Sequence, residues 1–203
     1  MYYFTYYWGD GNLFMIYGTF VAFICAGAAL MSGFFVKLFK GKRNVQLIAY
    51  AAGFVLNMII FYLNPSNSNG TVALALLLVT GITNGMNTAL LYALIGDATD
   101  YGQWKTGIRA DGLCSSGTSL MMKFGGAIAP SILLALLAVS GYVAGAEVQT
   151  EAALSSMNIV MNLIPAILAA VSFVLFLFYR LNDKKHAQIL ADLKERGEII
   201  INE

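Results

Sequence analysis

Residues 13–43, LFMIYGTFVAFICAGAALMSGFFVKLFKGKR, decide the fold of this chain. The first 24 residues of this stretch carry no charge, and the last seven carry four positive charges. A helix needs about 20 apolar residues to cross a hydrocarbon core of ~30 Å. The stretch therefore predicts a membrane-spanning helix that ends in a basic segment.

Four further apolar runs of similar length follow. With the first run, the predicted spans are residues 13–36, 45–63, 72–95, 113–139 and 157–179. None shows the alternating pattern of a barrel strand, so we expect an all-α, polytopic membrane protein with five full spans. The aromatic start, MYYFTYY at residues 1–7, is expected to be the end of a sixth helix at the headgroups.

The composition agrees with a chain that is solvated largely by lipid. Only 11% of its residues are charged and 59% are apolar, whereas a soluble domain carries roughly 25% charged residues. No basic patch exceeds a juxtamembrane cluster, so nucleic-acid binding is not expected. Cys25 and Cys114 belong to no metal-ligand spacing, and we expect no metal site.

The positive charges predict the topology. Eleven of the twelve lie in three segments after the first, third and fifth runs: Lys37, Lys40, Lys42, Arg43, Lys105, Arg109, Arg180, Lys184, Lys185, Lys194 and Arg196. The connections 64–71 and 140–156 carry none. The positive-inside rule then predicts a multi-pass cell-membrane protein with a cytoplasmic C-terminus. Because an odd number of spans leaves the start outside, we expect the chain to be the tail of a larger protein.

We expect two domains, a transmembrane half-domain over residues 1–180 and a cytoplasmic amphipathic tail over residues 181–203. In the tail, Ile189, Leu190 and Leu193 form a narrow apolar stripe. The stripe suits the inner membrane surface or the inner face of the protein itself. The side chain of His186 is expected to be solvated, because no second metal-binding residue type stands at ligand spacing.

Polar residues recur at helical spacing in the third run, at Thr80, Thr83, Asn84, Asn87 and Thr88. One interpretation is interhelical hydrogen bonding, with Gly81 and Gly85 allowing close approach of a neighbouring helix. The other is a face that lines an aqueous cavity, which we favour because packing rarely needs so many polar side chains.

Lys123 lies inside the fourth run, near mid-membrane, and shares a helical face with Ser116 and Ser119. A lysine there costs about 2.5 to 3.5 kcal/mol on insertion scales. No acid lies within any of the five runs. Lys123 is therefore expected to face an aqueous cavity, a ligand or another part of a larger protein.

The inner connection 96–112, GDATDYGQWKTGIRADG, is followed by Lys123 and resembles the signature of the glycoside–pentoside–hexuronide:cation symporters. This is the melibiose-carrier-like branch of the major facilitator superfamily. The matching residues are Asp97, Asp100, Tyr101, Gly102, Lys105, Gly107, Arg109, Asp111 and Lys123. Asp10, in YYWGDGNLF, also resembles the family's outer turn before its eighth helix. The resemblance covers nearly the whole chain and implies the C-terminal half of a twelve-helix fold.

The resemblance implies a secondary active transporter that couples sugar uptake to Na⁺ or H⁺ by alternating access. Its substrate cavity would include Lys123, with Thr80, Asn84, Asn87 and Thr88 as lining residues. Asp97, Asp100 and Arg109 would form an inner gate by pairing with the N-terminal half. The site of the coupling ion would lie in that half, and no other cofactor is expected. Thr88 stands where some sugar-binding members place an aromatic platform, with Tyr92 a turn further in.

The alternative is a non-transporting membrane scaffold or assembly subunit, in which the polar side chains serve packing alone. It predicts that Lys123 faces a partner helix and that no water path reaches it. An enzyme is not expected, because no nucleophile–base pair or metal-ligand set lies at one membrane depth.

Overall fold

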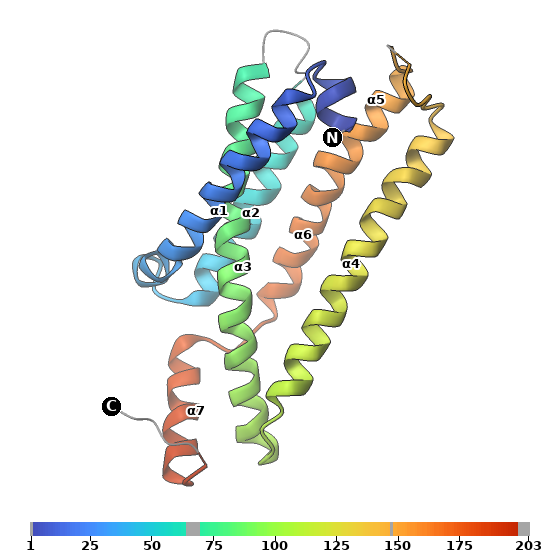
Figure 1. The fold of residues 1–203 in the computed structure, drawn as a ribbon. Helices are drawn as coiled ribbons and strands as arrows, with labels where there is room; N and C mark the ends of the chain where they lie inside the picture. The colour runs from blue at the N-terminus through green and yellow to red at the C-terminus, as the bar shows by residue number, and fades with distance from the viewer. Residues whose placement is uncertain (1, 64–69, 147, 199–203) are drawn as a thin grey trace.

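The computed structural model describes residues 2–63, 70–146 and 148–198, and within these residues the regular structure is helical (Figure 1). Five helices are long and apolar enough to cross a membrane: α1 (Asn12–Leu38), α2 (Lys42–Tyr62), α3 (Gly70–Thr106), α4 (Asp111–Val139) and the continuous helix Glu151–Leu177. The last comprises α5 (Glu151–Asn158), the π-helical turn η3 (Ile159–Leu163) and α6 (Ile164–Leu177). The all-α class and the five predicted spans are confirmed. The connection 64–69 and the tail end 199–203 lie outside the described residues.

The helices form an up-and-down bundle in which α3 packs against α2 and, in parallel orientation, against α1, while α2 packs against α6 (Figure 1). The helix α4 contacts the rest mainly through α5 at one end and α3 at the other, and its middle stands apart (Figure 1). The C-terminal ends of α1, α3 and α6 lie at the same end of the bundle (Figure 1). The three basic segments therefore meet there, and we call this the basic end.

Two glycines bring the backbones of α1 and α3 into contact. A Cβ atom added at Gly85 would lie 2.8 Å from the Cα atom of Cys25, and one at Gly81 would lie 2.8 Å from Val21 Cγ2. The thiol of Cys25 donates a hydrogen bond of 3.1 Å to the Gly81 carbonyl. The close approach predicted from the Gly81/Gly85 spacing is confirmed.

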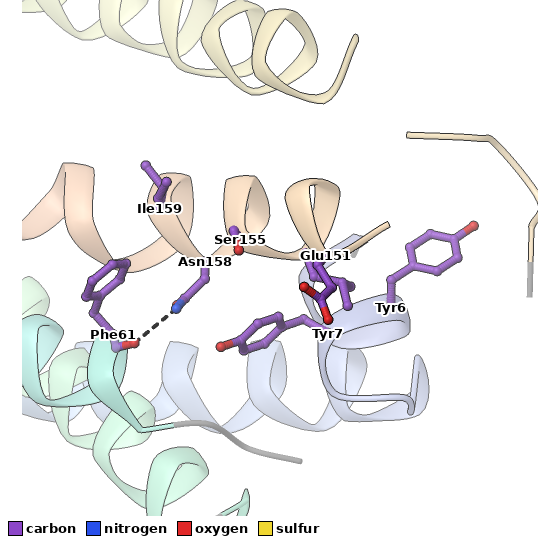
Figure 2. Close-up of a pocket in the computed structure, with 8 residues that line it drawn as sticks. Tyr6, Tyr7, Phe61, Glu151, Ser155, Asn158 and Ile159 are labelled. Carbon is purple, nitrogen blue, oxygen red and sulfur yellow. Dashed lines mark hydrogen bonds between the residues drawn. The ribbon is translucent and has the colours of Figure 1, made fainter. Parts of the chain in front are cut away.

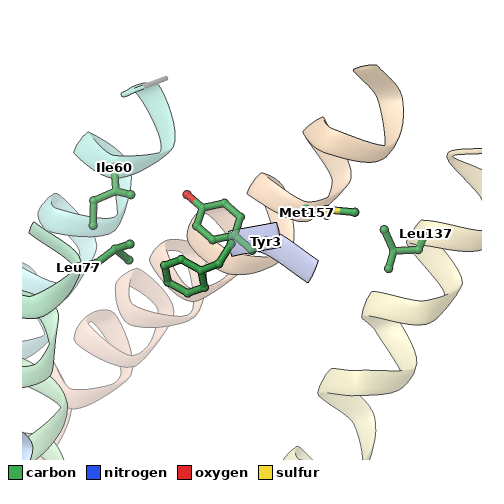
Figure 3. Packing of buried hydrophobic residues seen from close by; sticks show 6 residues of the cluster. Tyr3, Ile60, Leu77, Leu137 and Met157 are labelled. Carbon is green, nitrogen blue, oxygen red and sulfur yellow. The ribbon is translucent and has the colours of Figure 1, made fainter. Parts of the chain in front are cut away.

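Near the start of the chain lies a π-helical turn, η1 (Tyr3–Tyr7), in which Tyr3 and Phe4 are buried. Figure 3 shows Tyr3 between Ile60 and Leu77 on one side and Met157 and Leu137 on the other. The Tyr3 hydroxyl also accepts a hydrogen bond of 3.0 Å from the side-chain amide of Asn162. This cluster packs η1 against α2, α3, α4 and α5 at the end opposite the basic end.

The helix α3 is much longer than its apolar run. Its 37 residues correspond to about 55 Å at ~1.5 Å per residue, well beyond a core of ~30 Å. The predicted inner connection 96–112 is thus helical as far as Thr106, because α3 continues beyond the apolar run that ends at Ile95. The helix ends at Gly107, which has φ +72° and donates a 2.7 Å hydrogen bond to the Gln103 carbonyl. A glycine in this conformation is a common helix terminator.

The tail forms a helix, α7 (Asp183–Glu195), beside the projecting end of α3 (Figure 1). Asn182 caps it by accepting a 2.8 Å hydrogen bond from the Lys185 amide. Ile189 and Leu193 are buried, and Tyr101, Trp104 and Tyr179 pack against them. Full burial of such an aliphatic side chain contributes about 1.5 to 3 kcal/mol. Of the two predicted positions for this stripe, the structure shows the one against the protein itself.

Candidate functional site

A cavity of about 270 Å³ lies between α3 and α4, toward the basic end. It is lined by Tyr92, Ile95, Gly96, Thr99, Asp111, Ser115, Thr118, Ser119 and Met122. The lining combines the phenol ring of Tyr92, four aliphatic hydroxyl groups and the carboxylate of Asp111 with apolar surface. Such a mixture suits a small polyhydroxylated ligand, whose ring can stack while its hydroxyls form hydrogen bonds.

The groups in this α3–α4 cavity differ in how far they are already paired. The hydroxyls of Thr99 and Thr118 donate to carbonyls of their own helices, at 3.0 Å each, to Ile95 and Cys114. Tyr92 is 60% exposed. We did not select Tyr92 or Ser119 as site residues from the sequence. The signal was present, since Tyr92 is four residues from Thr88 and Ser119 is four residues from Lys123.

Lys123 lies near the middle of α4 and is exposed. An added Cβ at Gly125 or Gly126, in the next turn, would have no heavy atom of the other helices described here within 4 Å. The ion pairs recorded within the described residues do not involve Lys123. This face of α4 is therefore open in the chain, and a substrate contact by Lys123 remains a prediction.

The polar stripe of α3 divides between two surroundings. Thr80 and Thr83 are buried, and their hydroxyls donate to the carbonyls of Leu77 and Thr80 at 2.6 and 2.8 Å. The side chain of Asn87 accepts a 2.8 Å hydrogen bond from Gln46 of α2. Packing thus accounts for these three residues.

Asn84 and Thr88 are exposed instead, and the Thr88 hydroxyl donates to the Asn84 carbonyl at 2.9 Å. None of the four predicted lining residues of α3, namely Thr80, Asn84, Asn87 and Thr88, lines the α3–α4 cavity. Their contact with a substrate remains a prediction, for which Asn84 and Thr88 are the better placed.

The predicted gate residues meet in a charged cluster at the basic end. The Lys42 ammonium donates to both carboxylate oxygens of Asp97, at 2.6 and 2.7 Å. The side chain of Asp97 is 8% exposed, so this pair is largely shielded from water. Lys42 was not selected from the sequence, because no spacing rule relates it to a residue 55 positions away.

Arg109 holds the other part of the cluster. Its guanidinium lies 2.9 Å from Asp100 and 2.6 Å from Asp111, and it also donates to Gln103 at 3.0 Å. Hydrogen bonds to Asp111 and then to Asp100 raise the pKa of Arg109 above its ordinary value. Asp97, Asp100 and Arg109 are thus all paired within this chain, and their predicted pairing with an N-terminal half remains a prediction.

His186 of α7 completes the cluster, and the prediction that it is solvated is wrong. Its Nε2 lies 2.9 Å from Asp100 and its Nδ1 3.6 Å from Asp97, and its side chain is 15% exposed. The physical reason is the docking of α7 on the projecting end of α3. The sequence gives no sign of this contact, because the apolar stripe of the tail fits a membrane surface equally well.

Tyr179 lies near this cluster, two residues beyond the end of α6. Burial, followed by the negative charges of Asp97 and Asp183, raises the pKa of Tyr179 to about 12. Its hydroxyl is buried without a hydrogen-bond partner among the described residues. Tyr179 therefore stays neutral at physiological pH.

A larger cavity, of about 540 Å³, opens at the end opposite the basic end. Figure 2 shows Tyr6, Tyr7, Phe61 and Glu151 around it, with Asn158 donating to the Phe61 carbonyl at 3.0 Å. It lies between η1, α2 and α5, away from Lys123. We place the candidate site in the α3–α4 cavity, because that cavity lies beside the one lysine of an apolar run.

Comparison with known proteins gives the chain a family. The model of a family described as MFS/sugar transport protein matches residues 1–183. The chain is 32% identical to the glucuronide carrier protein homolog of Escherichia coli, covering 86% of the chain and 37% of that protein. It is 32% identical to a putative sulfoquinovose importer of the same bacterium, covering 97% and 41%. For the isoprimeverose transporter of Lactiplantibacillus pentosus, the identity is 30% and the coverage 77% and 32%.

The chain thus spans about a third to two fifths of the length of these relatives. No solved structure matches it. The five apolar helices and the family match across nearly the whole chain agree with each other. The chain therefore belongs to the glycoside–pentoside–hexuronide branch of the MFS/sugar transport proteins.

Proposed function

We propose that the complete protein is a secondary active symporter that couples the uptake of an anionic sugar to Na⁺ or H⁺. The observation that carries this proposal is the exposed Lys123 on the open face of α4, beside a cavity lined by hydroxyl groups. An ammonium group at this depth is stabilised by a counter-ion, and an anionic substrate supplies one. The protein would be a carrier and not an enzyme.

The names of the relatives support the anionic substrate class. Two are named for glucuronide and sulfoquinovose, which bear a carboxylate and a sulfonate. The isoprimeverose transporter is named for a neutral sugar. In our proposal the Lys123 ammonium binds the anionic group, while Tyr92 and Ser119 contact the sugar ring.

The charged cluster at the basic end would act as the inner gate. Alternating access requires ion pairs that form in one state and separate in the other. The cluster joins α2, α3 and the segment before α4 through Lys42, Asp97, Asp100 and Arg109. His186 adds α7 to it. We propose that it faces the cytoplasm of the cell membrane, as the positive-inside rule predicts, and exchanges partners with an N-terminal half.

The test is concentrative uptake by cells that express the complete transporter, under an imposed Na⁺ or H⁺ gradient. Lys123→Ala should lower glucuronide uptake about tenfold or more, because a charged partner is lost from a desolvated pair. Uptake of a neutral glycoside should fall much less. Lys184→Ala, at an exposed position of α7, is the matched control and should leave uptake unchanged. Unchanged glucuronide uptake with Lys123→Ala would contradict the proposal.

A packing-only scaffold would need a partner helix over Lys123. The family match, to a model described as MFS/sugar transport protein, supports a transporter instead. We therefore do not propose the scaffold as a second function.

A further inference from the structure

His186 is the only histidine in the chain. Its two ring nitrogens face two different carboxylates, Nδ1 that of Asp97 at 3.6 Å and Nε2 that of Asp100 at 2.9 Å. Both aspartates belong to α3, whereas the histidine belongs to α7. The ring therefore joins the tail helix to both acidic residues of the candidate gate.

The protonation state of the ring decides how many of these contacts are favourable. A neutral imidazole has a single N–H group, so it donates to one carboxylate and turns a lone pair toward the other. An imidazolium donates at both nitrogens and carries a positive charge. Histidine is also the side chain whose charge ordinarily changes between about pH 5 and 8.

Other charged groups lie in the same cluster. The two acids that contact the ring, Asp97 and Asp100, are also paired with Lys42 and Arg109. Asp111 pairs with Arg109, Asp183 accepts a hydrogen bond from the Lys42 amide, and Lys185 lies over the ring of Tyr101. An imidazolium at His186 would make a favourable contact with both of its aspartates.

We propose that His186 is a pH-dependent positioning residue of the gate, which as an imidazolium docks α7 on α3 and holds Asp97 and Asp100 together. When His186 loses its proton, one of the two carboxylates loses its favourable contact with α7 but keeps its pair with Lys42 or Arg109, and α7 loosens. The gate role of the two carboxylates rests on the proposed function, but the docking of α7 does not. Docking can therefore be measured without any transport.

Trp104 reports on this docking directly. Its indole N–H donates to Asp192 of α7 at 2.9 Å, and its carbonyl accepts from Arg196 at 3.1 Å. Trp8, at the opposite end, is the other tryptophan of the chain. In a Trp8→Phe background, the fluorescence of Trp104 thus reports whether α7 covers it.

The experiment uses the chain in lipid nanodiscs between pH 5.5 and 8.5. Amide hydrogen exchange of α7, corrected for its intrinsic dependence on pH, is measured with both tryptophans present. On raising the pH we expect a red shift of Trp104 emission and exchange in α7 faster by about tenfold, as for the loss of one charge-assisted hydrogen bond. Emission and exchange that do not change with pH would overturn the proposal.

Variants assign the effect to His186. His186→Gln should abolish the pH dependence and give α7 the fast exchange of the high-pH state at every pH. Asp100→Asn, which removes one of the two acceptors, should also reduce the pH dependence. Lys184→Gln, at an exposed position of the same helix, should retain it in full. Retention of the full pH dependence by His186→Gln would show that another group is responsible, provided that exchange in α1 to α3 is unchanged.

Discussion

The helices α3 and α4 are adjacent in the chain and of similar hydropathy, yet they are packed very differently. In the most apolar window of each, 39% of the residues of α3 are buried but only 6% of those of α4. The helix α3 lies against α1, α2 and α7, whereas α4 is held mainly at its two ends (Figure 1).

This difference decides what the polar side chains can do. On α3, Thr80 and Thr83 are buried and bonded to their own helix, so they serve the bundle. On α4, Ser119 and Lys123 are exposed on an open face. Polar residues of a membrane helix are candidates for a binding surface only where packing leaves them exposed. Here these are Ser119 and Lys123 of α4 and, on α3, Asn84 and Thr88.

Substitutions at two glycines should show the largest difference in packing between α3 and α4. Gly85→Ala should destabilise the chain by about 2 to 4 kcal/mol, because the new methyl group meets the backbone of Cys25 and α1 must move. Gly125→Ala on α4 should range from neutral to about 1 kcal/mol stabilising, because it meets open space and favours the helix. Thermal unfolding in detergent measures both, and equal effects would mean that α3 and α4 do not differ in packing.

A smaller effect is expected at the basic end of α3. Asp97→Asn should destabilise the chain by about 1 to 3 kcal/mol, because the Lys42 ammonium loses its carboxylate in a shielded position. Glu195→Gln, which removes an acid from an exposed position of α7, should change stability by less than about 0.5 kcal/mol. Denaturant unfolding compares the two, and a cost for Asp97→Asn no larger than that of the control would show that the pair contributes little.

The smallest effect is expected at Tyr179, which packs where α6, α7 and the end of α3 meet. Because the pKa of Tyr179 is raised to about 12 in the folded chain, its contribution to stability is present below the ordinary tyrosine pKa of about 10 and is lost as the pH rises through about 12. Tyr179→Phe should change the free energy of unfolding little at pH 7, since the buried hydroxyl has no hydrogen-bond partner among the described residues. Between pH 10 and 12 the variant should lose less stability than the unmodified protein. Unfolding curves at pH 7, 10 and 12 measure this difference. If both proteins lose the same stability at high pH, Tyr179 is not the group responsible.

The sequence was sufficient for features that depend on local pattern. Runs of apolar residues predicted the five helices, and the charge pattern predicted a basic end. The Gly81/Gly85 spacing predicted close approach of a neighbouring helix, which the structure identifies as α1. The resemblance assigned Asp97, Asp100 and Arg109 to one inner gate, and in the structure the three residues lie in one charged cluster. Each of these rests on spacing along one segment.

Features that depend on tertiary contact were missed. The extension of α3 contains Gly96, Gly102 and several charges, which on local propensity favour a connection. Its helix is stabilised by α7, from a part of the chain that is about 90 residues away. His186 was missed for the same reason. The polar stripe of α3 is one face by its spacing, but its two edges have different surroundings. Thr83 is buried, whereas the next residue, Asn84, is exposed.

The central claim is that α4 presents an aqueous, substrate-facing surface whereas the corresponding part of α3 is packed. The most direct test is the labelling of Ser119→Cys and Thr83→Cys by a water-soluble thiol reagent, in the complete transporter with Cys25 and Cys114 replaced by serine. Ser119→Cys should be labelled quickly and be protected by glucuronide, whereas Thr83→Cys should be labelled slowly with or without the sugar. Slow labelling of Ser119→Cys, or labelling that glucuronide does not slow, would contradict the account.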